Sequence, residues 1–266
     1  MTPPIQAAKG TALITGASGG IGEALAWEFA RDGYGLVLVA RRQGKLDTLA
    51  QELTRKHGIP CRALAVDLAR PDGPGQAVDA VRKAGIAVDI LVNNAGVGLS
   101  GPFARTDLQR ELDLLQLNVT SLVVLTKLLL PDMVARRKGR ILNVSSTAAF
   151  VPGPYMAGYY ASKAYSLSLS IALAEELRGT GVTVTTLCPG PIRTGFEAVA
   201  GISQSRLFRW FSSGDVAGVA RAGYRGLMAG RALVAPGWFA KFTVATAGIG
   251  PRTMAAKLAR YLDLAA

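Results

Sequence analysis

Three side chains between residues 146 and 163 have the types and spacing of an acid–base group. Tyr159 and Lys163 are four residues apart, so on a helix they lie on the same face. An ammonium group beside a phenol stabilises the phenolate, and we expect Lys163 to lower the Tyr159 pKa from its reference value of about 10. Tyr159 could then donate or accept a proton near neutral pH while the Ser146 hydroxyl holds the reacting oxygen. Taken alone, the pair is a weak pattern, and an ordinary aromatic at a helix start with a solvated lysine is the favoured interpretation.

The elements that must position this group begin with a strand over 11–15, the glycine-rich turn GASGGIG over 16–22, and a helix over about 23–31. Strand, glycine turn and helix in this order are the context of a dinucleotide-binding site. Gly16 permits the tight turn, Gly20 lets a pyrophosphate approach the backbone, and Gly22 lets the helix pack on the sheet. The free N–H groups at the helix start favour phosphate. The residues expected to contact the cofactor here are Gly16, Ser18, Gly20, Ile21 and Gly22.

Two arginines follow the second predicted strand, which covers 35–40. In dinucleotide folds an acidic residue at this strand end binds the ribose 2′-hydroxyl, whereas a nearby arginine accommodates a 2′-phosphate. This strand ends in Ala40, without a carboxylate, and a guanidinium pairs well with phosphate. We therefore predict NADP(H) rather than NAD(H), with Arg41 as the main contact and Arg42 as the second. The alternative is a pair of surface arginines at a helix start.

Polar residues also end the third predicted strand, from Cys61, and the fourth, from Val88. Asp67 could accept a hydrogen bond from an adenine amino group, or it could cap the following helix, and the sequence leaves both open. The stretch 93–96, NNAG, fits a loop beside the cofactor, although a plain Asn/Gly turn has the same composition.

The remaining sequence continues the alternation of helices and strands. Residues 106–138 are apolar nearly all round, which predicts a helix buried on several sides or shared with a subunit interface. Asn118 interrupts this run and needs hydrogen-bond partners if it is buried, and Pro131 is expected to bend or end the helix. Residues 195–212 are expected to form a mobile apolar segment suited to closing over a hydrophobic substrate; the alternative is a surface connection with one amphipathic turn. The other predicted elements are strands from 139, 182 and 232, the helix that carries Tyr159, a rigid turn over 189–194, and a helix over about 213–229.

Composition narrows the classes of function. The 266 residues carry a formal net charge of +12, which favours anionic partners, but the basic residues form no aromatic-interleaved stripe and we expect no nucleic acid. The chain has one histidine, His57, and two distant cysteines, Cys61 and Cys188, so we expect no metal site. Free thiols and the lack of a signal-like N-terminus predict a reducing, cytoplasmic location, and we expect no integral membrane span. Peripheral membrane contact through the basic C-terminal tail, residues 238–266, stays open.

These motifs occur together in an order and spacing that resemble the short-chain dehydrogenase/reductase family, from about residue 10 to residue 235. The resemblance implies a catalytic triad of Ser146, Tyr159 and Lys163, with Asn118 as a fourth member that anchors a proton-relaying water. It further implies that Lys163 holds the nicotinamide ribose. The motifs that carry it are TGASGGIG, NNAG, Asn118, Ser146, YYASK and PGPIRT.

The same resemblance assigns cofactor contacts. It makes Asp67 the adenine contact, Asn93 a cofactor-loop residue, and Ile192 and Thr194 contacts of the nicotinamide carboxamide. Arg41 matches the pattern of members that prefer NADP. The cofactor set predicted beyond the glycine loop is Arg41, Arg42, Asp67, Leu68, Asn94, Ala95, Gly96, Tyr159, Lys163, Pro189, Gly190, Ile192 and Thr194.

The predicted fold is α/β: one doubly wound Rossmann domain with a seven-stranded parallel sheet over 1–236, and a helical extension over 237–266 packed on it. The predicted function is hydride transfer between NADP(H) and a hydrophobic carbonyl or secondary alcohol, with Tyr159 as general acid/base. By resemblance the protein forms a homodimer or homotetramer. The alternatives are a non-catalytic NADP(H)-binding regulator on the same fold, or a protein that attaches to membranes through its tail.

Overall fold

The computed structural model describes residues 9–212 and 214–263, and in it seven parallel strands form one sheet. The order β3-β2-β1-β4-β5-β6-β7 confirms the predicted doubly wound α/β fold. The order reverses between β1 and β4, and in such sheets ligands bind outside the carboxyl ends of the strands at this point. The strands are β1 (Thr11–Thr15), β2 (Gly35–Ala40), β3 (Cys61–Ala65), β4 (Ile90–Asn93), β5 (Gly139–Val144), β6 (Val182–Leu187) and β7 (Leu233–Val234).

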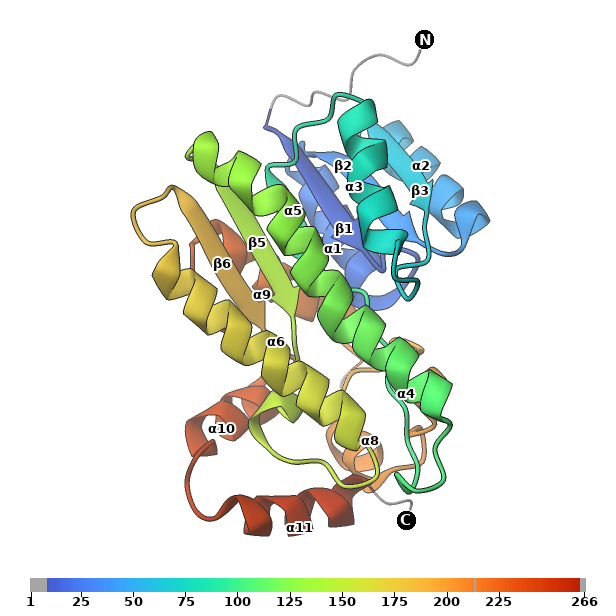
Figure 1. Ribbon diagram of the computed structural model, residues 1–266, viewed down its shortest axis with the longest axis vertical. Coiled ribbons are helices and arrows are strands. Elements are labelled where there is room, and N and C mark those ends of the chain that lie inside the picture. The colour runs from blue at the N-terminus through green and yellow to red at the C-terminus, as the bar shows by residue number, and fades with distance from the viewer. Residues whose placement is uncertain (1–8, 213, 264–266) are drawn as a thin grey trace.

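Helices cover both faces of the sheet (Figure 1). One face is covered by α1 (Gly20–Arg31), α2 (Gln43–His57) and α9 (Val216–Met228). The other is covered by α3 (Gly73–Lys83), α5 (Ser121–Ala135) and α6 (Ala157–Glu176). The remaining helices are α4 (Leu108–Leu115), a π-helical turn η1 (Gln116–Thr120), a 3₁₀ turn η2 (Thr147–Phe150), α7 (Phe196–Ala200), α8 (Arg206–Phe211), α10 (Trp238–Thr246) and α11 (Arg252–Asp263).

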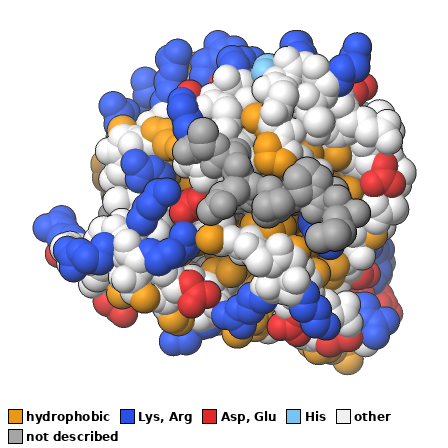
Figure 2. Space-filling view, turned by 90° about the horizontal axis from the view of Figure 1, so that it is seen from above, with side chains coloured by type: hydrophobic (Ala, Val, Ile, Leu, Met, Phe, Trp, Pro, Cys, Tyr) orange, Lys and Arg blue, Asp and Glu red, His pale blue; other side chains and the backbone are white. Residues whose placement is uncertain are grey.

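Basic side chains are spread over the face seen from above in Figure 2, which lies at the amino ends of the strands. Lys and Arg side chains surround this face and Asp and Glu side chains stand among them. The positive charge on this face is therefore dispersed rather than gathered in one stripe.

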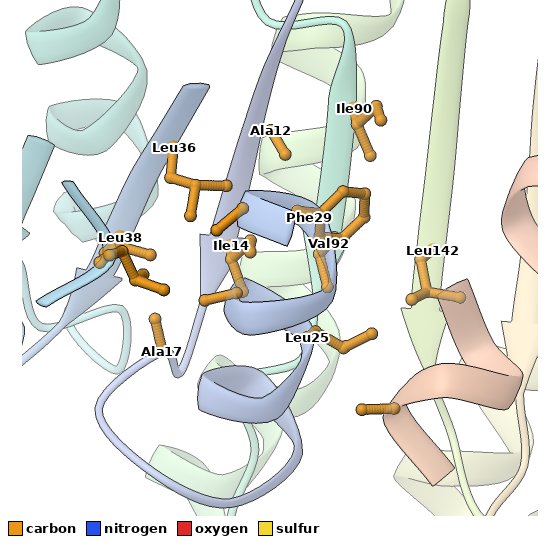
Figure 3. Close-up of a cluster of buried hydrophobic side chains, with 14 of the residues drawn as sticks. Ala12, Ile14, Ala17, Leu25, Phe29, Leu36, Leu38, Ile90, Val92 and Leu142 are labelled. Carbon is orange, nitrogen blue, oxygen red and sulfur yellow. The ribbon is translucent and has the colours of Figure 1, made fainter. Parts of the chain in front are cut away.

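Successive residues of the strands enter different cores because strand side chains alternate between faces. Ile14 of β1 packs with Leu25 and Phe29 of α1 (Figure 3), whereas Leu13 packs with the helices of the opposite face. All five residues of β1 are buried, as expected for a strand covered on both sides.

The continuous helix Leu108–Ala135 is long and apolar enough to cross a membrane by length and composition, with 39% of its most apolar window buried. Its contacts with α3, α6 and the sheet make it part of the covering layer instead. Pro131 does not end this helix, which continues to Ala135.

Several boundaries differ from the predicted ones. Helix α1 begins at Gly20 rather than at residue 23, so part of the glycine turn is the first turn of the helix. The segment 195–212 contains two short helices, α7 and α8. The tail forms α10 and α11, whose inner sides bury Ala240 and Ala259. The Tyr160 hydroxyl of α6 donates a hydrogen bond to Asp263 Oδ1 at 3.0 Å, which ties the end of α11 to the Tyr159 helix.

Candidate active site

The glycine loop is braced by Asn94, the first residue after β4. Asn94 Nδ2 donates to the carbonyls of Thr15 and Gly16 at 2.8 and 3.3 Å. A Cβ on Gly16 would lie 2.7 Å from that nitrogen, and one on Gly22 would lie 2.4 Å from it and from the Gly16 oxygen. Gly16 also has a φ of 66°. Both glycines are therefore required by the turn and by its close packing against β4, which leaves backbone N–H groups at the start of α1 for phosphate.

We expect Gly22→Ala to weaken dinucleotide binding at least about tenfold and to lower stability by roughly 1–3 kcal/mol, because the new methyl group must displace Asn94 or the loop backbone. Fluorescence titration with NADPH and thermal unfolding would measure both. The matched control is Gly44→Ala in α2, where a Cβ meets nothing within 4 Å. Equal behaviour of the two variants would contradict this account of the loop.

Thr15 joins β1 to β4 at the point where the strand order reverses, a role that the sequence analysis missed. Its hydroxyl donates to the Val92 carbonyl at 3.1 Å and accepts from the N–H groups of Asn94 and Ala95 at 2.9 and 3.0 Å. A threonine at a strand end just before a glycine turn is the only signal of it in the sequence.

The two arginines after β2 have different surroundings. Arg42 Nη2 donates to the Ser18 carbonyl at 3.1 Å and to the Ser18 hydroxyl at 3.0 Å, so Arg42 is tied to the glycine loop. Arg41 is exposed, and its side chain makes no hydrogen bond or ion pair with the described residues. In the described residues, the Arg42 guanidinium is therefore bound to the glycine loop, whereas the N–H groups of Arg41 are available to a ligand.

Three predicted cofactor residues have structural roles. Asp67 Oδ1 accepts from the Ala69 N–H at 3.0 Å, which closes a turn, and the N-cap position of α3 is occupied by Asp72 rather than by Asp67. Leu68 is 3% exposed and belongs to the core under α3 and α5. Asn93 is not a loop residue, because its amide lies inside the sheet and donates to Asn143 Oδ1 at 2.9 Å.

Ser146, Tyr159 and Lys163 come together at the carboxyl end of β5. Ser146 is the N-cap residue of η2, and its hydroxyl accepts from the Ala148 N–H at 3.1 Å and lies beside the Tyr159 side chain. Lys163 is buried, and its Nζ donates to the Val144 carbonyl at 2.9 Å and lies 5.8 Å from the centre of the Tyr159 ring. The predicted grouping of these three side chains is present in the structure.

The expected lowering of the Tyr159 pKa is wrong. Burial raises the pKa of Tyr159 to about 12, and the hydrogen bond with Ser146 opposes this only in part. Burial also lowers the pKa of Lys163 to about 8. The physical reason is that both groups lose hydration, while the Lys163 ammonium is directed to a backbone carbonyl rather than to the phenol.

Asn118 lies in the π-helical turn, a feature that is frequent at functional sites. Its Nδ2 donates to the Val97 carbonyl at 2.9 Å and to Ser162 Oγ at 3.0 Å, and its Oδ1 accepts from the Val97 N–H at 2.9 Å. A Cβ on Gly96 would lie 3.2 Å from Asn118 Oδ1 and 3.4 Å from Lys163 Nζ. Asn118 therefore fixes the loop after β4 beside Lys163, and the water relay stays a prediction.

The loop after β6 closes the other side of the site. Pro189 accepts from the Thr147 N–H at 2.9 Å, Ile192 is buried, and a Cβ on Gly20 would lie 3.0 Å from the Thr194 Cβ. A Cβ on Gly190 would lie 3.1 Å from Phe239 of α10. The predicted cofactor residues of this loop thus face the glycine loop on one side and the tail on the other.

An apolar cluster, which we call the lid cluster, adjoins Tyr159. The Phe196 and Tyr159 rings have centroids 5.1 Å apart. Segment 195–212 was predicted to cover the substrate, but its individual contact residues were not predicted, because apolar content was their only signal in the sequence. The buried members of the lid cluster are Ala148, Met156, Tyr160, Ala200, Ile202 and Phe208, with Val151, Tyr159 and Phe196 packed against them.

Two cavities lie near the candidate site, and Tyr159 lines neither of them. One of about 400 Å³ lies beside Ser18, between the glycine loop and α2. The other, of about 420 Å³, is lined by residues 149–154, the Tyr160 side of α6, and Arg252 of α11. Residues 9–212 and 214–263 contain no cluster of three or more His, Cys, Asp or Glu side chains suited to a metal ion.

A doubly wound parallel sheet with a glycine loop at its switch point defines a dinucleotide-binding protein of the Rossmann class. The chain matches the family described as short chain dehydrogenase over residues 10–204, and it belongs to that family.

Among curated proteins, it is 41% identical over 198 residues to a very-long-chain 3-oxoacyl-CoA reductase of Phaeosphaeria nodorum, covering 72% of this chain and 58% of that protein. It is 39% identical to 17-beta-hydroxysteroid dehydrogenase type 3 of Mus musculus, covering 69% of this chain and 60% of that protein. The matched part therefore spans about three fifths of the length of these relatives.

Solved structures of the family superimpose on nearly the whole chain. A short-chain dehydrogenase from Sphingobium yanoikuyae in complex with NADPH has a TM-score of 0.80 at 34% identity, covering 89% of this chain and 92% of that one. The bulky-bulky ketone specific alcohol dehydrogenase from Comamonas testosteroni has a TM-score of 0.76 at 30% identity, and the match covers 90% of this chain and 93% of that one. This chain accordingly has the nucleotide-binding Rossmann fold of the short-chain dehydrogenase family.

Proposed function

We propose that this protein is an NADP(H)-dependent oxidoreductase that interconverts a hydrophobic ketone or aldehyde and the corresponding alcohol, with Tyr159 as general acid/base. The observation that carries the proposal is the convergence of Tyr159, Ser146 and Lys163 at the carboxyl end of β5, next to the switch point of the sheet. A protein that only bound the dinucleotide would not need all three groups at one place.

The residues present fit a nicotinamide dinucleotide. Gly16 and Gly22 let the loop pack closely on Asn94, which leaves the backbone N–H groups at the start of α1 for phosphate, and Gly96 brings the backbone after β4 close to Lys163. We assign the phosphates to the start of α1 and the nicotinamide side to Ile192 and Thr194 of the loop after β6. When bound, the nicotinamide supplies the hydride for reduction or accepts it in oxidation.

The protein side chains handle the proton. In reduction, Ser146 and Tyr159 donate hydrogen bonds to the carbonyl oxygen, and Tyr159 transfers its proton as negative charge develops there. The Lys163 ammonium lies close enough to stabilise the resulting phenolate. Asn118 holds the loop that lines this side, which keeps Lys163 in place.

The lid cluster supports a hydrophobic substrate, because residues that close over Tyr159 are apolar or aromatic. The names of the similar proteins agree with this choice, since they refer to a very-long-chain acyl thioester, a steroid and bulky ketones. We therefore place the substrate among long-chain or polycyclic carbonyl compounds.

For the cofactor, we propose that Arg41 binds the 2′-phosphate while Arg42 holds the glycine loop. We expect Arg41→Ala to lower the NADPH/NADH ratio of kcat/KM by at least about tenfold, because it removes a charge-assisted pair to the phosphate. We expect Arg42→Ala to raise KM for both dinucleotides, since the glycine loop then loses the hydrogen bonds that Arg42 donates to Ser18. The NADPH-bound relative supports the cofactor choice. Indistinguishable ratios for the wild type and Arg41→Ala would overturn the assignment.

The test of the function is consumption of NADPH and NADH by the purified protein with a panel of long-chain 3-oxoacyl thioesters, steroid ketones, bulky aryl ketones and short aldehydes. We expect turnover with NADPH and the larger apolar ketones. NADPH binding without turnover across the panel would favour a regulatory protein on the same fold. The cytoplasmic location and a homodimeric or homotetrameric state remain part of the proposal.

A further inference from the structure

Large apolar side chains are exposed on the outer sides of the tail helices and of the neighbouring α8. They are between 51% and 69% exposed. We call them the tail surface, and its members are Trp210, Trp238, Phe242, Met254, Leu258 and Tyr261.

Helical spacing places these residues on the outer sides of the helices, opposite the buried ones. On α11, Met254, Leu258 and Tyr261 are separated by four and three residues, whereas Ala259 and Asp263 face inward. On α10, Trp238 and Phe242 are one turn apart, and Ala240 is buried. The inner sides hold the helices on the domain, and in the described residues the outer side chains stay more than half exposed.

Ring contacts join the three helices into one surface. The Trp210 and Tyr261 rings have centroids 6.3 Å apart, and Phe211 contacts Trp238 at 6.0 Å and Phe239 at 4.9 Å. Arg206 of α8 donates to the Tyr261 carbonyl at 3.0 Å and lies over its ring. In Figure 1, α8, α10 and α11 lie together at the end of the molecule where β5 ends.

The charges of this surface have one sign. The three helices contain six basic residues and one acid, and the acid, Asp263, is buried against Tyr160. None of the six forms a salt bridge with another described residue. This differs from the opposite end of the molecule, where acids stand among the bases (Figure 2). The basic residues are Arg206, Arg209, Lys241, Arg252, Lys257 and Arg260.

We propose that the tail surface docks on an anionic lipid membrane. Exposed tryptophan, tyrosine and aliphatic side chains beside lysine and arginine are the chemistry of a peripheral membrane surface, because the rings occupy the interface and the cations attract the headgroups. A second copy placed against this face would bring the six cations of each chain together, which disfavours that occupant.

The tail surface also borders the candidate active site. Phe208 of α8 belongs to the lid cluster, and Phe239 of α10 packs against Gly190 of the loop after β6. Docking therefore places the lid at the lipid boundary, where a hydrophobic substrate is dissolved. The inference concerns membrane binding and does not depend on turnover, so it stands or fails separately from the proposed activity.

The test is sedimentation of the full chain with vesicles of phosphatidylcholine alone or mixed with phosphatidylserine. We expect binding to the anionic vesicles only, with a blue shift of tryptophan emission that Trp238→Ala diminishes. The double variant Lys241→Glu/Lys257→Glu should weaken binding by at least about tenfold, because both cations lie beside the apolar stripe. The matched control, Arg55→Glu/Lys83→Glu on exposed ends of α2 and α3, should bind like the wild type.

Circular dichroism and NADPH binding confirm that each variant is folded. No sedimentation of the wild type, or equal loss in the control pair, would overturn the proposal. A change of oligomeric mass without vesicles, in the tail variants alone, would identify a second copy as the occupant and would also overturn it.

Discussion

Replacing Tyr159 with phenylalanine is expected to reduce kcat by about 10³-fold while NADPH binding stays within about twofold of the wild type. The variant removes the proton that the carbonyl oxygen must receive, but it keeps the ring that packs on Phe196 at 5.1 Å. Steady-state kinetics with the best substrate of the panel, together with a fluorescence titration of NADPH, would separate the two effects.

The neighbouring tyrosine offers a matched control. Tyr160→Phe removes a hydroxyl that binds Asp263 Oδ1, and Asp263 Oδ2 already has no partner among the described residues. Burial already raises the pKa of Asp263 to about 6. Because Tyr160→Phe leaves the second oxygen of this buried carboxyl group unpaired as well, it should lower the free energy of unfolding by about 1–3 kcal/mol. Turnover should remain close to that of the wild type. If Tyr159→Phe kept its activity and Tyr160→Phe lost it, the general acid would be assigned to the wrong residue.

Replacing Lys163 with methionine is expected to lower kcat by about 10²-fold or more, because no cation then stabilises the Tyr159 phenolate. The same change should alter the pH dependence of stability in a defined direction. The pKa of Lys163 is about 8 in the folded chain, below its ordinary value of 10.5. Below pH 8 both states are charged, and the cost of burying the ammonium is present in full.

As the pH rises from about 8 to 10.5, the folded chain releases this proton before the unfolded chain does, so the cost disappears. The wild type should therefore gain up to about 3 kcal/mol relative to Lys163→Met across this window. Urea unfolding of both proteins at pH 7 and pH 10.5 measures the difference. Lys127→Met, on an exposed side of α5, is the matched control. A constant difference for Lys163→Met would mean that Lys163 keeps its ordinary pKa.

The local sequence was sufficient to predict the fold, whereas the grouping of the candidate site was predicted from the family resemblance of its motifs. Apolar strands that alternate with helices predict a parallel sheet, and the carboxyl ends of such strands meet at one edge. The sheet brings the residues after β1, β4, β5 and β6 to that edge, as their positions in the chain predicted. These features follow from periodicity and turn chemistry, which act over short distances along the chain.

Tertiary structure decided the environment of each side chain. Asn93 pairs with Asn143 inside the sheet because it is the last residue of β4, while Asn94, one position later, reaches the glycine loop. The sequence contains both amides side by side and does not distinguish them.

The pKa values of Tyr159 and Lys163 likewise depend on surroundings that the sequence does not reveal. Sequence spacing predicted an attraction between a phenol and an ammonium, but burial by distant segments removed their hydration and shifted both pKa values the other way. The exposed outer sides of α10 and α11 likewise depend on tertiary structure, because only the packing of their inner sides on the domain decides which side faces outward. Desolvation and packing depend on residues far apart in the chain, so only the folded structure determines them.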